Sequence, residues 1–223
     1  FMSVGPNLKW IREKDINNKF QLILFFFISL IVSFSIYMQI GKTNLINTVL
    51  VASSLYLFIV TTKDFFSKEL YNFSKKISHF GFSLLILSIL LNAIFSSEAI
   101  FNVKVGEKFT FKNEKILFKS LVKSQKENYQ SVIGNFTIED EKKSISMFKP
   151  ELRIYEQPLV VTSEADIKTT LFKDEFLVMN KIKGNEYFNV RYQVKPFMIW
   201  IWISTILLAI GGILSLFNRL YEK

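Results

Sequence analysis

The sequence predicts a multi-pass α-helical membrane protein with four transmembrane helices and an inserted small antiparallel β domain, barrel- or sandwich-like. Three observations lead to this fold class. Four uncharged stretches are each about as long as a membrane span, a long segment between the third and fourth alternates apolar and polar residues, and the composition is mixed. Half of the 223 residues are apolar and 24 are Phe, yet 21% are charged, so the chain cannot lie in a membrane throughout.

The four uncharged stretches are the predicted spans. A helix needs about 20 apolar residues to cross about 30 Å of hydrocarbon. The spans are expected at about residues 20–41, 43–62, 77–97 and 196–218. The alternative, four buried core helices of a water-soluble protein, fits this length poorly. The short Gly41-Lys42 turn predicts that the first two spans form a helical hairpin, and Pro196 is expected at the first helical position of the fourth. Trp200 and Trp202 follow, as in an aromatic belt.

Lysine and arginine near the span ends predict the orientation. Residues 1–19, the link 63–76 and the tail 219–223 are basic, which places them in the cytoplasm and residues 98–195 outside the membrane. The formal charge of +9 suits nucleic acid or an anionic membrane surface. Because the positive charges are spread over span-flanking segments and the outer domain, no nucleic acid partner is expected.

The segment from residue 98 to residue 195 is predicted to form six or seven short strands. Alternation is clearest in residues 188–195, and the turn before that strand is assigned to Gly184-Asn185. Val132, Phe136 and Ile138 form another alternating set, in which Gly134 predicts a bulge or a tight bend. Residues 152–155, between two prolines, are expected to form an edge strand.

Few residues carry chemistry by themselves. The chain has no Cys and one His, which excludes disulfides, thiolate sites and a two-histidine haem site made by this chain alone. Acids in the β domain are interpreted as solvated, and Arg153 and Arg191 as structural ion pairs or exposed residues; the acids are Glu151, Glu164, Asp166 and Asp174. No catalytic residue is predicted.

His79 is the one candidate ligand, because it lies near the inner end of the third span. Ionisable residues within spans are costly and often functional. Ser83 shares its face one turn on, and Gly81 permits close approach of a helix or a flat macrocycle. Neutral imidazole is a good iron ligand at such a depth. The alternative is an interfacial histidine that hydrogen-bonds a headgroup or a carbonyl.

Several motifs, in order along the chain, resemble the C-terminal part of the CcmF/CycK family of cytochrome c-type biogenesis proteins, membrane subunits of bacterial haem lyases. The matching segments are Val4-Gly5-Pro6 through Trp10, His79-Phe80-Gly81, Asn128-Tyr129, Pro150 through Tyr155, Thr162 through Ile167, Val190-Arg191-Tyr192, Pro196, Ile201-Trp202 and Gly211-Gly212. Ser163 stands where the family usually has threonine, and Phe188 where tryptophan is usual.

The resemblance implies a place in the bacterial inner membrane with a periplasmic β domain. The family passes haem from a haem chaperone to apocytochrome c, together with other cytochrome c maturation subunits. It holds haem b between two membrane histidines, so His79 would be an axial ligand of the haem iron. The family's tryptophan-rich loop and the second ligand are missing from this sequence. The chain also does not begin with Met, so we expect the C-terminal part of a longer polypeptide that lacks its N-terminal half.

The expected function is therefore that of the C-terminal part of a membrane haem lyase subunit, not active as this chain alone. A non-catalytic membrane-anchored scaffold, whose outer β domain docks partner proteins, is the alternative. A transporter half is a weaker one, because His79 is the only ionisable candidate within a span and lies near its end.

Overall fold

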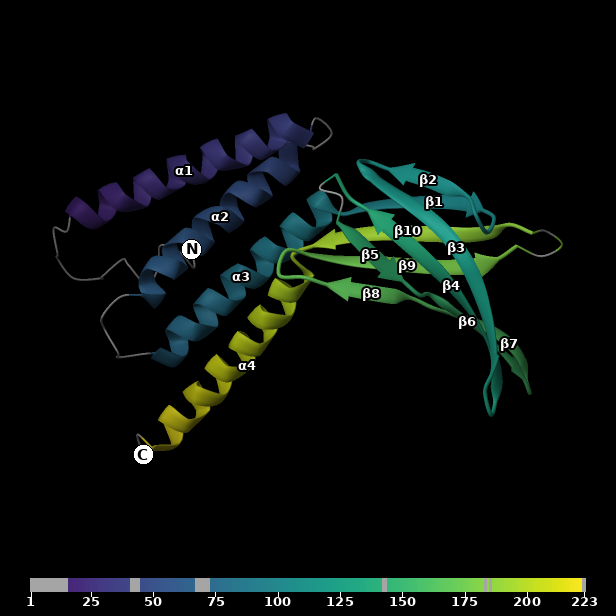
Figure 1. Ribbon diagram of the computed structural model, residues 1–223. Coiled ribbons are helices and arrows are strands. Elements are labelled where there is room, and N and C mark those ends of the chain that lie inside the picture. The colour runs from purple at the N-terminus through teal and green to yellow at the C-terminus, as the bar shows by residue number, and fades with distance from the viewer. Residues whose placement is uncertain are drawn as a thin grey trace. The chain divides into compact units, whose positions relative to one another are not determined.

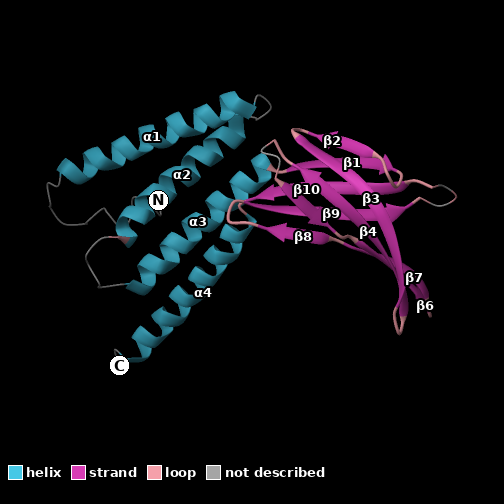
Figure 2. Cartoon of the chain, viewed as in Figure 1, coloured by secondary structure: helices cyan, strands magenta, loops and turns pink. Residues whose placement is uncertain are grey.

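The computed structural model describes residues 16–40, 45–66, 73–141, 144–182, 184 and 186–221. The chain divides into two compact units, a helical unit of residues 1–95 and 197–223 and a β unit of residues 96–196. Figure 2 shows that the described helices and strands are segregated between these units. The predicted fold class, membrane helices with an inserted antiparallel β domain, is confirmed.

The helical unit contains four helices that are long and apolar enough to cross a membrane. They are α1 (Ile16–Ile40), α2 (Leu45–Phe65), α3 (Phe73–Phe95) and α4 (Met198–Tyr221). Each packs mainly against its neighbours in this order, so that they form a row (Figure 1). The third helix begins before the predicted Ile77 and ends before Ser97, which already belongs to a strand. The turn assigned to Gly41-Lys42 lies outside the described residues.

The fourth helix does not begin at Pro196 as predicted. Pro196 is the last residue of the preceding strand, where it pairs with Lys173. Phe197 then has φ 62°, a left-handed conformation that separates strand from helix, and its carbonyl accepts from the Trp200 amide at 3.2 Å. The strand extends to the proline because a proline at a strand end gives up no ladder hydrogen bond that the sheet needs.

Small residues make the helix contacts. A Cβ at Gly81 of α3 would lie 3.1 Å from the Leu208 amide nitrogen of α4, and one at Gly211 of α4 would lie 2.8 Å from the Ser78 nitrogen of α3. Between α2 and α3, the hydroxyls of Thr61 and Ser83 are 2.6 Å apart. Close backbone approach through Gly and Ser is typical of helices that pack within a membrane.

The β unit is a sandwich of two antiparallel sheets. The first has the strand order β1-β10-β9-β8 and the second β2-β3-β4-β6-β7, with β5 also paired to β4. The strands are β1 (Ser97–Val103), β2 (Lys108–Phe111), β3 (Glu114–Gln125), β4 (Tyr129–Glu139), β5 (Ile145–Phe148), β6 (Glu151–Glu156), β7 (Leu159–Glu164), β8 (Asp166–Thr169), β9 (Lys173–Lys181) and β10 (Phe188–Pro196).

Its core lies between the sheets and is rich in aromatic rings. Phe118 and Phe136 stack at 4.2 Å between centroids, and Phe188 meets Phe118 edge-on at 5.5 Å. The predicted alternation in residues 188–195 is confirmed, because Phe188, Val190 and Tyr192 are buried. The same holds for Phe136 and Ile138 of β4.

Three details of the predicted β domain were wrong. The described residues contain ten strands, more than the six or seven expected. Residues 152–155 belong to β6, which is an interior strand because β4 pairs on one side and β7 on the other. The bulge lies in β3, between Phe118 and Ser120, and not at Gly134. Gly134 is required for another reason: a Cβ there would lie 2.6 Å from Met179 Sδ of the facing sheet.

Candidate functional site

His79 lies on a part of α3 that neither neighbouring helix covers fully. Ser78 and Gly81 face α4, whereas Phe80 stacks on Phe65 of α2 at 4.9 Å between ring centroids. At 100° per residue, His79 falls between these two contacts. It is half-buried and shares a stripe with Phe82 and Ile86, and Phe82 is exposed.

The two residues predicted to accompany His79 are both engaged in helix packing. Ser83 is fully buried, donates to the Phe80 carbonyl at 2.8 Å and lies 2.6 Å from the Thr61 hydroxyl. Gly81 is covered by α4, so its close approach is to a helix and not to a macrocycle. The structure therefore places His79 away from its expected companions.

Asp64 is a neighbour of His79 that the sequence reasoning missed. It lies at the end of α2 and interacts electrostatically with His79 and with Lys63. Their proximity follows from the packing of Phe65 against Phe80, each one residue further along its helix. The available signal was the carboxylate of Asp64 two residues after the predicted end of the second span at residue 62, since α2 continues to Phe65 and includes it.

The resemblance motifs around Glu151 form a polar cluster on the outer face of the second sheet. Arg153 Nε donates to Glu151 Oε2 at 3.0 Å, Ser131 donates to Glu151 Oε1 at 2.5 Å, and Glu164 lies 3.9 Å from Arg153. The guanidinium stands 5.2 Å from the ring centre of Tyr129. Burial raises the pKa of Glu151, but the hydrogen bonds from Ser131 and Arg153 outweigh it, and the net pKa is below the ordinary value.

A second charged cluster lies partly inside the sandwich and was not predicted. Lys173 Nζ approaches Glu114 Oε1 at 3.4 Å and also pairs closely with Glu175. Burial lowers the pKa of Lys173, yet the two carboxylates outweigh it and the net pKa is raised. Tyr192 is fully buried beside them, so burial and then the charge of Glu175 raise its phenol pKa. These neighbours keep the tyrosine protonated.

Arg191 and Asp166, also singled out in the sequence, have structural partners. Asp174 was expected to be solvated, but this was wrong: it is buried, and its Oδ1 has no hydrogen-bond partner among the described residues. Arg191 Nε pairs with Glu98 Oε1 at 2.7 Å, and Gln193 donates to Glu98 Oε2 at 2.6 Å. These hydrogen bonds hold the pKa of the exposed Glu98 below its ordinary value. Asp166 accepts from the Lys149 amide. Among the described residues there is no group of three His, Cys, Asp or Glu that could hold a metal ion.

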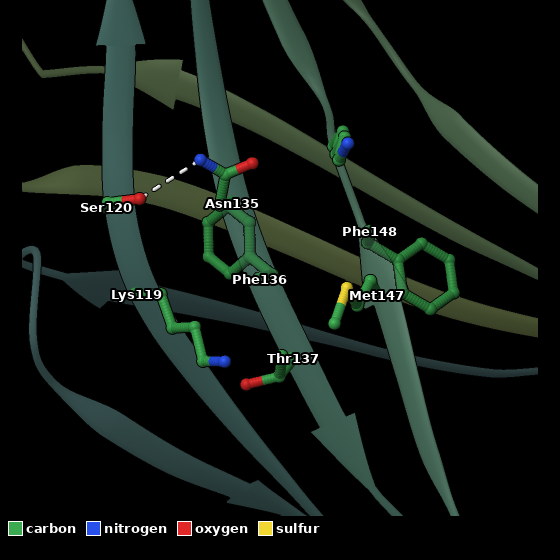
Figure 3. Close-up of a pocket in the computed structure, with 8 residues that line it drawn as sticks. Lys119, Ser120, Asn135, Phe136, Thr137, Met147 and Phe148 are labelled. Carbon is green, nitrogen blue, oxygen red and sulfur yellow. Dashed lines mark hydrogen bonds between the residues drawn. The ribbon is translucent and has the colours of Figure 1, made fainter.

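The described part of the β unit contains a small pocket and a larger cleft. A pocket of about 250 Å³ lies beside the bulge in β3, where Asn135 donates to Ser120 at 3.0 Å, and Lys119 and Met147 also line it (Figure 3). A larger cleft of about 1230 Å³ lies between the sheets.

Fold and composition together define a membrane protein whose last span follows an inserted antiparallel β-sandwich. Residues 94–196 match the family model described as the CcmF C-terminal beta-sandwich. The resemblance that the sequence motifs indicated, to the C-terminal part of CcmF, is thus confirmed.

Curated relatives agree with this match. The chain is 26% identical to the cytochrome c-type biogenesis protein CcmF of Pseudomonas aeruginosa over 147 residues, which cover 66% of this chain and 22% of the relative. It is 23% identical to CcmF of Escherichia coli over 234 residues, covering 100% of this chain and 36% of that protein. With cytochrome c-type biogenesis protein ccl1 of Rhodobacter capsulatus it shares 29% identity over 152 residues, 68% of this chain and 23% of the relative. The chain therefore spans well under half the length of these relatives.

The fold is also that of a solved protein. The structure named Cytochrome c Heme Lyase CcmF superimposes with a TM-score of 0.71 and 16% identity, covering 95% of this chain and 37% of that one. At this identity the likeness concerns the fold.

Proposed function

We propose that this chain acts in cytochrome c biogenesis as the C-terminal part of a membrane haem lyase, and that His79 ligates a b-type haem. The carrying observation is that the only histidine of the chain lies half-buried in a membrane-length helix, at the position that the family resemblance assigns to a haem ligand. The names of the relatives support the biogenesis role.

The residues around His79 fit one side of a haem. The imidazole supplies one strong nitrogen ligand, and the stripe that continues through Phe82 and Ile86 supplies an apolar wall. The resemblance implies a haem held between two histidines, and this chain has one His and no Cys, so we propose that the second histidine comes from a partner segment. A bound b-type haem would supply one-electron redox chemistry.

Asp64 is suited to orient the imidazole of His79. A histidine that binds a metal through one ring nitrogen usually donates its other N–H to a carboxylate or a carbonyl. Asp64 interacts electrostatically with His79 and is suited to this acceptor role, whereas the Ser83 hydroxyl is held by Thr61 and the Phe80 carbonyl. Asp64 would thereby orient the imidazole.

The proposed setting is the bacterial inner membrane, with the β-sandwich in the periplasm. The proposed partners are the remaining N-terminal part of the protein, the other maturation subunits, a haem chaperone and apocytochrome c. The basic flanks of the spans support this orientation. Because the chain has no native Cys, a cysteine at Glu186 should react with an impermeant maleimide in spheroplasts while one at Lys75 is protected. The reverse pattern would contradict the orientation.

The haem assignment is tested by absorption spectroscopy of the purified full-length complex. His79→Ala should lower the b-haem content and change the reduced spectrum, and His79→Gln should do nearly the same because an amide oxygen is a poor iron ligand. Thr205→Ala, at an exposed position on α4, is the matched control. If His79→Ala kept a full complement of b haem and the native spectrum, His79 would not be a ligand, and the scaffold function would gain support.

A further inference from the structure

The larger cleft of the β-sandwich has an apolar interior that the sandwich does not fill. Its volume is about 1230 Å³, above the 300–1,000 Å³ usual for small-molecule pockets. The inner faces of both sheets contribute to it. The apolar part of the lining consists of Val105, Leu121, Val132, Leu152, Ile154, Val161 and Phe188, and most of the other lining residues are polar or charged. An open apolar surface of this size is unfavourable in water unless a partner covers it.

Two lysines reach into the same cleft from opposite sheets. Lys123 of β3 is paired across the ladder with Val132, and Lys181 of β9 with Phe188, so both stand on the inner, cleft-lining faces. Neither has a carboxylate within ion-pair distance among the residues that the structure describes. At the rim, Lys104 is already paired with Glu186 at 3.1 Å. The cleft is therefore apolar with an uncompensated positive charge.

The side of the cleft formed by β7 is an unprotected sheet edge. Among the described strands, β7 is the last of its sheet and pairs only with β6. Leu159, Val160 and Val161 are 80%, 44% and 59% exposed, and Val161 also lines the cleft. Exposed edges are normally blunted by lysine or other charges. The edge strand β2 has Lys108 and β1 has Glu98, whereas the charge of β7 is confined to its last residue, Glu164, which is paired with Arg153.

We propose that an extended, acidic segment of a partner protein adds as a strand to β7 and covers the cleft. The free backbone groups of β7 would pair with the segment, and its apolar side chains would lie beside Leu159 and Val161 on the inner face. Its inner-face acidic side chains would meet Lys181, whose neighbour Asn180 accepts a hydrogen bond from Ser163 of β7. A peptide fits better than a small ligand, because the cleft is large and continuous with an unpaired strand edge. This inference does not depend on haem binding by His79.

Peptide binding to the full chain in nanodiscs of neutral phosphatidylcholine tests the proposal. The probe is a fluorescein-labelled ten-residue peptide of sequence Val-Thr-Asp-Thr-Val-Thr-Asp-Thr-Val-Thr, which as a strand has its Val and Asp side chains on one face. Its binding is followed by fluorescence anisotropy. Two comparison peptides carry Lys in place of Asp, or N-methyl groups at every second residue of the acidic sequence. The acidic peptide should bind at least tenfold more tightly than either, because it alone combines the required charge with free backbone donors.

Variants then locate the site. Val161→Asp, at an exposed position that should tolerate the change, should weaken binding of the acidic peptide about tenfold or more. Lys181→Glu should do the same and should favour the lysine peptide. Ile145→Asp on β5 and Lys108→Glu on β2 are matched controls, since both residues are exposed and neither lines the cleft. Neither control should change binding.

Three outcomes would overturn the proposal. One is equal binding of the acidic and N-methylated peptides, which excludes strand addition. Another is acidic-peptide binding that survives the cleft variants, which places the peptide elsewhere. The third is saturable binding of dodecanoate that Val161→Asp abolishes, with no binding of any peptide, which makes the cleft a site for small anionic amphiphiles.

Discussion

The helical unit and the β-sandwich bury opposite kinds of side chain. In the sandwich, Phe118, Phe136 and Phe148 are at most 1% exposed. In the helical unit, Ser29, Ser83 and Ser204 are fully buried, while large apolar residues such as Phe27 and Ile31 are 55% and 66% exposed. The sandwich buries its aromatic rings, whereas the helical unit exposes large apolar side chains.

The difference shows which solvent each unit is built for. Water drives apolar area inward at roughly 25 cal/mol per Å², so the sandwich gathers its rings between the sheets. Lipid tails are as apolar as leucine and provide no such drive, so helices gain from close approach through small residues and from interhelical hydrogen bonds. The contrast supports a membrane location for the four helices and an aqueous one for the sandwich.

The largest expected effect comes from removing a ring of the sandwich core. Phe118→Ala should destabilise the β unit by about 3–5 kcal/mol, because the cavity would remain between Phe136 and Phe188. Phe27→Ala on α1 is the comparison and should cost far less, since no cavity forms at an exposed site. Urea unfolding of the detergent-solubilised chain, followed by hydrogen exchange of each unit, measures both. Equal losses of stability in the two variants would contradict the difference between the buried core of the sandwich and the exposed surface of the helices.

A smaller loss is expected from overpacking the α3–α4 contact. Gly211→Leu should cost about 1–3 kcal/mol, because even a Cβ there would collide with the backbone of α3 at Ser78. The adjacent Gly212 has no atom within 4 Å of such a Cβ, so Gly212→Leu is a matched control expected to be close to neutral. Thermal unfolding followed by helical circular dichroism separates them. If Gly211→Leu left the unfolding temperature unchanged, the packing of α3 on α4 would not depend on close approach of the two helices.

The polar cluster on the outer face should make the sandwich sensitive to acid. The folded-state pKa of Glu151 is below its ordinary value of about 4.3. Its carboxylate therefore stabilises the fold fully above that pH and progressively less as the pH falls through the lower, folded-state value. Glu151→Gln should lower the free energy of unfolding at pH 7. The difference in unfolding free energy between this variant and the native chain should become smaller below about pH 4. Urea midpoints between pH 7 and pH 3 test this, and a constant difference would exclude the linkage.

The smallest effect concerns the hydrogen bond between α2 and α3. Ser83→Ala removes the partner of Thr61 but should cost only about 0.6 kcal/mol, the average for such bonds within membranes. Thr61 also donates to carbonyls of its own helix, which limits the loss. Thermal unfolding in detergent, compared with Ser53→Ala at an exposed site on α2, measures the difference. A loss of several kcal/mol would mean that this hydroxyl pair has another role.

Local pattern was enough to predict the architecture. Uninterrupted apolar runs of spanning length predicted the four helices, and alternation predicted the strands β4 and β10. These signals are local, because span length and strand alternation depend on consecutive residues. The polar motifs of residues 150–166 were noticed for their resemblance to a family, and the structure adds that Glu151, Arg153 and Glu164 contact one another.

Long-range pairing, in contrast, could be decided only by the tertiary structure. The sequence by itself determined that His79 lies within a span and that residues 152–155 form a strand. Only the tertiary structure shows that Asp64 lies near His79 and that Ser83 faces Thr61. This holds equally for β7, which pairs with β6 and is the edge strand of its sheet. The same is true of Lys173, which meets Glu114 from a strand far away in the chain. Which helix faces meet and which strand lies outermost depend on contacts between distant residues, and periodicity within one segment carries no information about its partner.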